Sequence, residues 1–358
     1  MFKDLIVVEL ASVLAGPDVG MFFAEMGARV IKIENKNTNG DVTRQWRIAS
    51  EKSNKENISA YFSAVNWNKE HLFLDLKQAN DKKQVANLLK DAAIVIANFK
   101  PGDAEKFSLD YNSIKQINPT IIYGEINGFG EADNRVAYDV VLQAETGFMA
   151  MNGTASSGPL KMPIAMIDVL AAHQLKEGIL VALLNKAQSG KGAYVQVSLY
   201  DAAISSLKNQ ATNWLMNSEN AKLLGSLHPN IAPYGETYQT KDGKWIVLAI
   251  GTDKQFKSML TIIGATALIN DERFFSNVKR VENRSVLDEL LKNYFNQISL
   301  SSFQEKFNKA NVPFGIIKDI KTVFEEDKAK ALILEEKKGS ITTKCVKTAI
   351  FKLIESEN

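Results

Sequence analysis

The sequence predicts an α/β protein with a larger domain built on a doubly wound, mostly parallel sheet and a smaller α+β domain. Three observations support this prediction. The chain has 358 residues, of which 45% are hydrophobic, enough for two cores. Short β-branched runs alternate with helical patterns between Leu5 and Glu125, as in a parallel sheet with crossover helices. After Gly225 this alternation gives way to a hairpin pattern followed by helices.

The first elements form a βαβ unit. A β-branched run predicts a strand at Leu5–Glu9, and a turn over Ala11–Pro17 leads into a predicted helix at Asp18–Met26. A second strand follows at Arg29–Glu34. The turn lacks the Gly-x-Gly-x-x-Gly spacing that lets a backbone approach a pyrophosphate, so a nicotinamide dinucleotide site is not expected.

The alternation continues through the next elements of the large domain. These are strand Leu72–Leu76, helix Asn80–Lys90, strand Ala93–Ala97, helix Tyr111–Ile117 and strand Thr120–Glu125. In a doubly wound sheet, ligands bind at the carboxyl ends of the strands. The segments Asn98-Phe99-Lys100 and Asn127–Gly130 fall at these ends and predict the walls of a site.

A long apolar helix is predicted from Val169 to Leu184, with Asp168 at its start. Its apolar residues cover most of the circumference, so the helix should be buried along with its beginning. An Asp at that position fits an ordinary helix cap, held ionised by backbone N–H groups and the helix dipole. It also fits a carboxylate nucleophile screened from water. The helix pattern alone leaves both interpretations open.

The remaining chain contains the predicted smaller domain and a return to the first. A strand at Tyr194–Ser198 and a helix at Tyr200–Asn217 are followed by hairpin strands and three helices. The predicted hairpin and helices are Tyr234–Gln239, Lys244–Ala249, a helix after Asp253, Asn283–Phe295 and Ser301–Ala310. The last part holds a short helix near Thr322–Asp327 and extended runs at Ala331–Glu335 and Ala349–Leu353.

Composition excludes several classes of protein. The formal charge of +2 gives no general attraction to nucleic acid or to a membrane, so the partner should be a small molecule. Cys345 is the single cysteine, and His71, His173 and His228 have no metal-ligand spacing. No metal site, Walker loop or Gly-x-Ser-x-Gly elbow is therefore predicted. The N-terminus has no signal-peptide layout, which predicts a cytoplasmic protein.

Several motifs resemble the class III (family III) CoA-transferases, the CaiB/BaiF-like family. They occur in the family's order over nearly the whole chain. The motifs are Val13-Leu14-Ala15-Gly16-Pro17, Gly27–Glu34, Gly40-Asp41-Val42-Thr43-Arg44, Asn68-Lys69, Leu74–Lys77, Asn98–Gly102, Asn118-Pro119, Gly128-Phe129-Gly130, Tyr138-Asp139, Gly190-Lys191-Gly192, Asp201-Ala202 and His228–Tyr234.

The resemblance implies a Rossmann-like large domain built from both ends of the chain, and two subunits interlocked as a homodimer. It places the large CoA-binding domain at residues 1–200, completed by about 321–358, a linker helix at 201–224 and the small domain at 225–320. It also implies that Asp168 is the nucleophile, held by the helix start, and that coenzyme A enters as an acyl-CoA substrate.

The implied chemistry moves CoA between an acyl-CoA and a free carboxylic acid. Asp168 attacks the thioester to give a mixed anhydride, and the CoA thiolate then forms an aspartyl thioester, from which the acceptor acid takes the CoA. The resemblance also assigns the residues along CoA. These are Val13, Ala15, Leu74, Lys77, Asn98, Phe99, Lys100, Lys106, Ala137, Tyr138 and Asp139.

Two departures and two alternatives accompany the resemblance. Asn35 stands where some members carry an Arg for a CoA phosphate, so either Lys36 or Arg44 is expected to replace it or the affinity for CoA is expected to be lower. A tetraglycine loop is absent, so oxalate is not favoured as the acceptor. An α-methylacyl-CoA racemase would need a His where Tyr138 stands. A non-catalytic acyl-CoA-binding protein is the other alternative.

Overall fold

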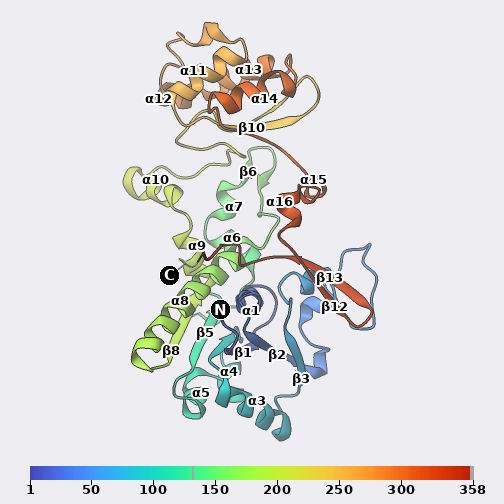
Figure 1. The fold of residues 1–358 in the computed structure, drawn as a ribbon. Helices are drawn as coiled ribbons and strands as arrows, with labels where there is room; N and C mark the ends of the chain where they lie inside the picture. The colour runs from blue at the N-terminus through green and yellow to red at the C-terminus, as the bar shows by residue number, and fades with distance from the viewer. Residues whose placement is uncertain (131–132, 355–358) are drawn as a thin grey trace. The chain divides into compact units, whose positions relative to one another are not determined.

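The computed structural model describes residues 1–130 and 133–354 and shows two compact units (Figure 1). The first unit combines Met1–Thr146, Met162–Asn209 and Asp327–Asn358. The second combines Gly147–Lys161 and Gln210–Glu326. The segment Gly147–Lys161, expected in the large domain, therefore groups with the second unit.

The first unit is built on a six-stranded parallel sheet, which confirms the predicted α/β class. Its strand order is β3-β2-β1-β4-β5-β8, so the chain reverses direction across the sheet next to β1. The strands are β1 (Ile6–Leu10), β2 (Arg29–Asn35), β3 (Glu70–Leu74), β4 (Ile94–Ala97), β5 (Ile122–Asn127) and β8 (Ala193–Ser198).

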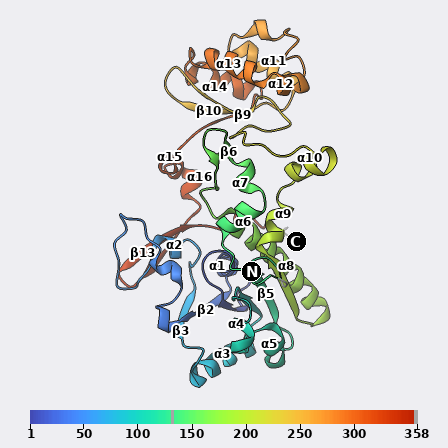
Figure 2. The ribbon, with the colours of Figure 1, turned by 180° about the vertical axis from the view of Figure 1, so that it is seen from behind.

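Helices cover both faces of this sheet (Figures 1 and 2). Tyr123 of β5 joins a buried cluster with Val85, Leu89 and Ile114 of the helices on one face. The next residue, Gly124, points the other way, where an added Cβ would lie 2.8 Å from Cδ1 of Ile179. The helices are α3 (Ala79–Asp91) and α5 (Tyr111–Ile117) on the first face, and α1 (Ala15–Glu25) and α8 (Met166–Ser189) on the second.

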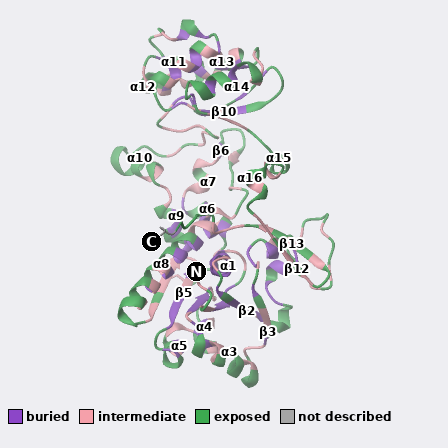
Figure 3. Cartoon of the chain, in the orientation of Figure 1, coloured by how far each residue is buried: buried purple, intermediate pink, exposed green. Residues whose placement is uncertain are grey.

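The core of the first unit lies in the sheet and the adjoining helix faces, as the buried residues in Figure 3 show. A C-terminal hairpin, β12 (Ile333–Lys338) with β13 (Ile341–Val346), lies beside β3, because Lys338 Nζ is 3.2 Å from Nε2 of His71. The unit's short helices are η1 (Lys36–Thr38), η2 (Val42–Gln45), α2 (Ala60–Ser63), α4 (Asp103–Phe107), α6 (Asp139–Glu145), α9 (Leu199–Ser205) and α16 (Asp327–Lys330).

The second unit is α+β. Its core is aromatic, with Tyr238 stacked on Phe295 at 4.9 Å and Phe303 packed beside them. The antiparallel sheet has the order β11-β10-β9, and β6 pairs with β7 in a separate two-stranded sheet. Its strands are β6 (Gly153–Thr154), β7 (Gly158–Pro159), β9 (Tyr234–Gln239), β10 (Trp245–Ala249) and β11 (Phe314–Ile316). Its helices are α7 (Phe148–Met151), α10 (Asn209–Asn217), α11 (Asp253–Ile262), η3 (Thr266–Leu268), α12 (Asn277–Glu282), α13 (Arg284–Phe295), α14 (Leu300–Lys309) and α15 (Ile320–Phe324).

Three sequence predictions of local structure are wrong. The helix expected over Tyr200–Asn217 is two helices, α9 and α10, because Lys208 between them has a left-handed backbone with φ of 43°. The run Ala349–Leu353 forms no strand. Helix α8 starts at Met166, so Asp168 lies inside its first turn.

No helix of the described chain has the length and apolarity that a membrane span requires.

Candidate active site

Asp168 is a buried carboxylate near the start of α8. It is the third residue of the helix, and its exposed fraction is 8%. The residue before the helix, Ala165, provides no side-chain cap, and no described residue donates a hydrogen bond to the Asp168 carboxylate. The predicted capping role of Asp168 is therefore wrong.

Asp139 caps this helix instead. Its Oδ1 accepts the backbone N–H of Ile167 at 2.7 Å, and its Oδ2 accepts Nε2 of Gln143 at 2.6 Å. Gln143 is fully buried, and its Oε1 accepts the N–H of Met162 at 2.7 Å. Two side chains of α6 thus hold both ends of the segment that leads to Asp168, which orients the helix start from outside the helix.

This environment changes the acidity of Asp168. Burial, followed by the neighbouring charge of Asp139, raises the pKa of Asp168 from 3.8 to about 7. The expectation that the helix start keeps Asp168 fully ionised is therefore wrong near neutral pH. Burial, followed by the charges of Asp168 and Asp139, also raises the pKa of Tyr61, which places this phenol in the same electrostatic neighbourhood.

Asp168 lines a cavity of about 460 Å³ at the carboxyl end of the sheet. A second cavity of about 770 Å³ extends from it past β2 and the segment after β3. Both cavities are lined by Ser12 and by Asn98, Phe99 and Lys100 after β4. Because they share these walls, they form one elongated groove that ends at Asp168.

Most of the residues implied by the resemblance lie along this groove. Near Asp168 it is lined by Val13, Ala15, Ala137 and Tyr138, and in the second cavity by Leu74 and Lys77. Two of the expected residues do not line it. Lys106 is exposed on α4, 3.9 Å from Asp103, and Asp139 is turned to the backbone of α8 as described above.

The loop between β1 and α1 is held rigidly beside the groove. Asn98 bonds the backbone of Ser12 twice, accepting its N–H at 2.9 Å and donating to its carbonyl at 2.8 Å. Asp41 accepts the N–H of Val13 at 3.1 Å. Val13 has φ of 71°, an unfavourable value for a β-branched residue, so these bonds maintain a strained backbone next to the site.

Buried ion pairs support this loop. Lys32 Nζ donates to Glu9 at 2.8 Å and to the carbonyl of Ala11 at 2.6 Å, and it lies 3.1 Å from Asp41. Lys69 pairs with the other oxygen of Glu9 at 2.7 Å. Burial lowers the pKa of Lys69 to about 8 despite the opposing effect of Glu9. The residue pattern did not reveal these roles, although charged residues inside β-branched strands signal buried partners.

A second buried cluster involves Arg44, one of the two residues expected to replace the Arg at position 35. Arg44 binds both oxygens of Glu34, at 2.7 and 2.6 Å, and is 4% exposed. It is therefore committed inside the protein and is excluded as the expected substitute. Lys36 donates to Asp81 at 2.8 Å, but this pair is partly exposed and can rearrange.

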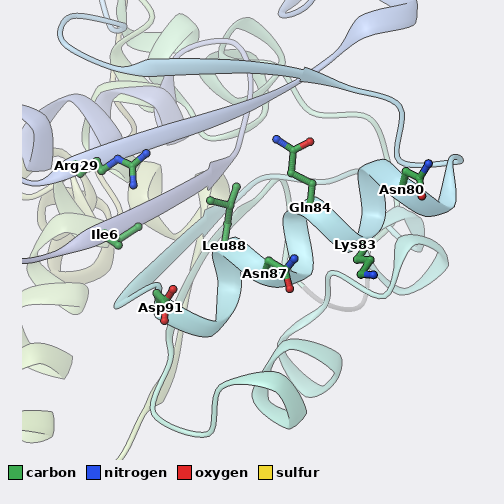
Figure 4. Close-up of a pocket in the computed structure, with 8 residues that line it drawn as sticks. All are labelled: Ile6, Arg29, Asn80, Lys83, Gln84, Asn87, Leu88 and Asp91. Carbon is green, nitrogen blue, oxygen red and sulfur yellow. The ribbon is translucent and has the colours of Figure 1, made fainter.

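A separate depression lies at the amino ends of β1 and β2 (Figure 4). Its lining includes Ile6, Arg29 and residues of one side of α3. Arg29 already binds both oxygens of Glu70. The depression is at the opposite end of the strands from Asp168 and is not part of this site.

In the described parts of the chain, no group of three His, Cys, Asp or Glu residues is placed to hold a metal.

In doubly wound α/β proteins, ligands bind at the carboxyl ends of the strands, so a groove there that contains a buried carboxylate of raised pKa is a candidate enzyme active site. The comparison with family models is specific. The chain belongs to CoA-transferase family III, whose model matches residues 2–349. It is an enzyme that transfers CoA from an acyl-CoA to a carboxylic acid.

Relatives and solved structures agree. The chain is 35% identical to a succinate–glutarate CoA-transferase of Agrobacterium fabrum, over 91% of this chain and 82% of that protein. It is 30% identical to the human succinyl-CoA:glutarate CoA-transferase, over 98% of this chain and 81% of that protein. A CaiB/BaiF family protein from Brucella suis has the same fold, with a TM-score of 0.83, 35% identity, and coverage of 97% and 91% of the two chains.

Proposed function

We propose that Asp168 is the nucleophile and carries first the acyl group and then CoA. The observation that supports this most directly is the burial of Asp168 in the wall of the groove, without a hydrogen-bond partner among the described residues. A carboxylate attacks a thioester to give a mixed anhydride, and the released CoA thiolate attacks the aspartyl carbonyl in turn. The acceptor carboxylate then attacks the aspartyl thioester, and the released CoA thiolate attacks the acceptor's carbonyl in the new anhydride. The acyl group stays activated as an anhydride or a thioester at every step.

Acyl-CoA lies along the groove in this proposal. The adenine and phosphates occupy the larger cavity near Leu74 and Lys77, and the pantetheine arm passes Asn98, Phe99 and Lys100 toward Asp168. The shared walls of the two cavities provide the continuity that such a ligand needs. Lys36 can turn from Asp81 toward a phosphate, since the pair is exposed to solvent on one side.

We further propose that the substrates are short dicarboxylic acids. The named relatives act on succinate and glutarate or their CoA thioesters. The Asp168 cavity also contains Arg135, whose guanidinium stacks 3.9 Å from the centre of the Phe129 ring. Arg135 pairs with Asp133 and Glu145, both at 2.9 Å and partly exposed, so a substrate carboxylate could exchange for either partner.

The enzyme is proposed to act as an interlocked homodimer in the cytoplasm. Helix α8 is apolar on almost all sides, which is typical of a helix surrounded by protein. In the single chain, however, Val181 is 57% exposed and Leu184 is 65% exposed. A second copy would cover this face.

The test is a CoA-transfer assay. Succinyl-CoA and other short acyl-CoAs are mixed with a panel of free acids, and new thioesters are detected by mass spectrometry. Incubation with succinyl-CoA followed by hydroxylamine should then modify Asp168 in the wild type. Asp168→Ala should lose turnover and the adduct, whereas Asp91→Asn, in the remote depression, should keep both.

Two results would contradict the proposal. If Asp168→Ala keeps normal turnover, Asp168 is not the nucleophile. If the wild type binds acyl-CoA but exchanges no CoA with any acid, the protein is the non-catalytic binder considered above. The racemase alternative lacks support because the described residues that line the Asp168 cavity include no histidine.

A further inference from the structure

Three consecutive backbone N–H groups at the start of α1 have no acceptor among the described residues. The first hydrogen bond of the helix is made by the N–H of Asp18, at 2.8 Å from the carbonyl oxygen of Leu14. Pro17 has no N–H, and Leu14, which precedes the helix, provides no side-chain cap. The N–H groups of Leu14, Ala15 and Gly16 therefore remain unpaired. Since Ala15 is only 5% exposed, such groups are expected to meet a ligand.

The same cavity contains a second group without a partner. Leu14 and Ala15 line the cavity into which Asp168 opens. Asp168 is only 8% exposed, and its carboxylate oxygens accept no hydrogen bond from the described chain. Donors without acceptors and an acceptor without donors thus face one space. Helix α1, which carries the donors, and helix α8, which carries Asp168, are joined by Lys176 of α8, which donates to Asp18 of α1 at 2.6 Å.

We propose that the N–H groups of Leu14 and Ala15 form the oxyanion hole for acyl transfer at Asp168. This inference rests on the proposed nucleophile. When the CoA thiolate adds to the aspartyl carbonyl of the anhydride, a C–S bond forms and the carbonyl electron pair moves to oxygen. Collapse restores the carbonyl, breaks the bond to the donor carboxylate and releases it, with no proton transferred.

The positive end of α1 stabilises the charge on that oxygen. Such donors are effective only if they are fixed before the reaction. Gly16 lies so close to the residue after β1 that an added Cβ would be 2.4 Å from the Cβ of Ala11. Together with the bonds of Asn98 to Ser12 and of Asp41 to Val13, this contact holds the helix start in one position.

The test removes single N–H donors while keeping the side chains. Amide-to-ester variants are made by incorporating α-hydroxy acids: Ala15→lactic acid, and Leu14→leucic acid as a second variant. The matched control is Ala79→lactic acid, because Ala79 is exposed and is also the first residue of a helix, α3, without a side-chain cap. Circular dichroism and the affinity for CoA verify that each variant folds.

The expected result is a fall in kcat of about 100-fold for Ala15→lactic acid, the usual effect of losing one oxyanion donor. Formation of the hydroxylamine-trapped adduct should slow in parallel, with KM within a few-fold and the control unchanged. If both folded esters, at Ala15 and Leu14, retain kcat within about twofold of the control, this outcome overturns the oxyanion hole and leaves the nucleophile standing. An active wild type without an Asp168 adduct would instead refute the proposed nucleophile and the hole with it.

Discussion

Replacing Asp168 by Asn should stabilise the protein, and more so as the pH rises. The pKa of Asp168 is about 7 in the folded protein, against 3.8 for an ordinary Asp. Between these values the folded protein holds a proton that the unfolded chain has released, so raising the pH destabilises the wild type. Each pH unit contributes up to about 1.4 kcal/mol. The advantage of Asp168→Asn should therefore grow by roughly 2 to 3 kcal/mol between pH 5 and pH 8 and level off above pH 8.

The assay is urea unfolding at pH 5, 6, 7 and 8. Trp46 and Trp67 belong to the first unit, whereas Trp214 and Trp245 belong to the second. Replacing the latter two by Phe in all proteins lets fluorescence report on the unit that contains Asp168. Asp91→Asn, which removes an exposed carboxylate of the same unit, is the control. A stability difference between wild type and Asp168→Asn that does not change with pH would refute the reasoning.

Three further predictions follow from the site and its supports. Asp139→Asn keeps an oxygen for the Ile167 N–H but removes the charge that helps to raise the pKa of Asp168. The pH dependence of kcat/KM should therefore shift to lower pH, by less than about one unit because burial is the larger cause of the raised pKa. An unchanged pH profile would contradict this prediction. Glu34→Gln leaves Arg44 without its buried partner and should lower the free energy of unfolding by about 3 kcal/mol at pH 7. The hydrogen bonds from Arg44 and His71 outweigh burial and lower the pKa of Glu34, so the loss of unfolding free energy in Glu34→Gln should shrink below about pH 4.5. An equal loss at pH 3.5 and pH 7, measured by urea unfolding, would argue against the ion pair. Leu184→Glu should convert the proposed dimer to monomer in light scattering, whereas Lys186→Glu, also on α8, should not.

The sequence predicts the regular part of the molecule well. Strands Ile94–Ala97 and Trp245–Ala249 have simple β-branched patterns. Their ends, and those of the hairpin partner Tyr234–Gln239, fall within a few residues of the prediction. The break at Lys208 was missed because its left-handed backbone depends on local geometry that carries no Gly signal.

The supports of the site were harder to predict for a different reason. Asp139 acts on Ile167 across 28 residues, and Asp41 acts on Val13 from another element, so neither role follows from spacing along one helix. The pKa of Asp168 is raised mainly by burial, which depends on parts of the chain that are distant in sequence. What the sequence provides is the candidate carboxylate, and tertiary packing determines its acidity and its orientation.

The hairpin of β12 and β13 has a consequence for synthesis of the protein. Strand β3 is at one edge of the large sheet, and the neighbouring Trp67 and His71 meet Glu335 and Lys338 of the hairpin. The ribosome makes β3 more than 250 residues before it makes the hairpin, since the Trp67–Glu335 separation is 268. During that interval the border of the nascent sheet is uncovered and open to pairing with other chains. Truncation before Ile333 would make that exposure permanent and favour aggregation.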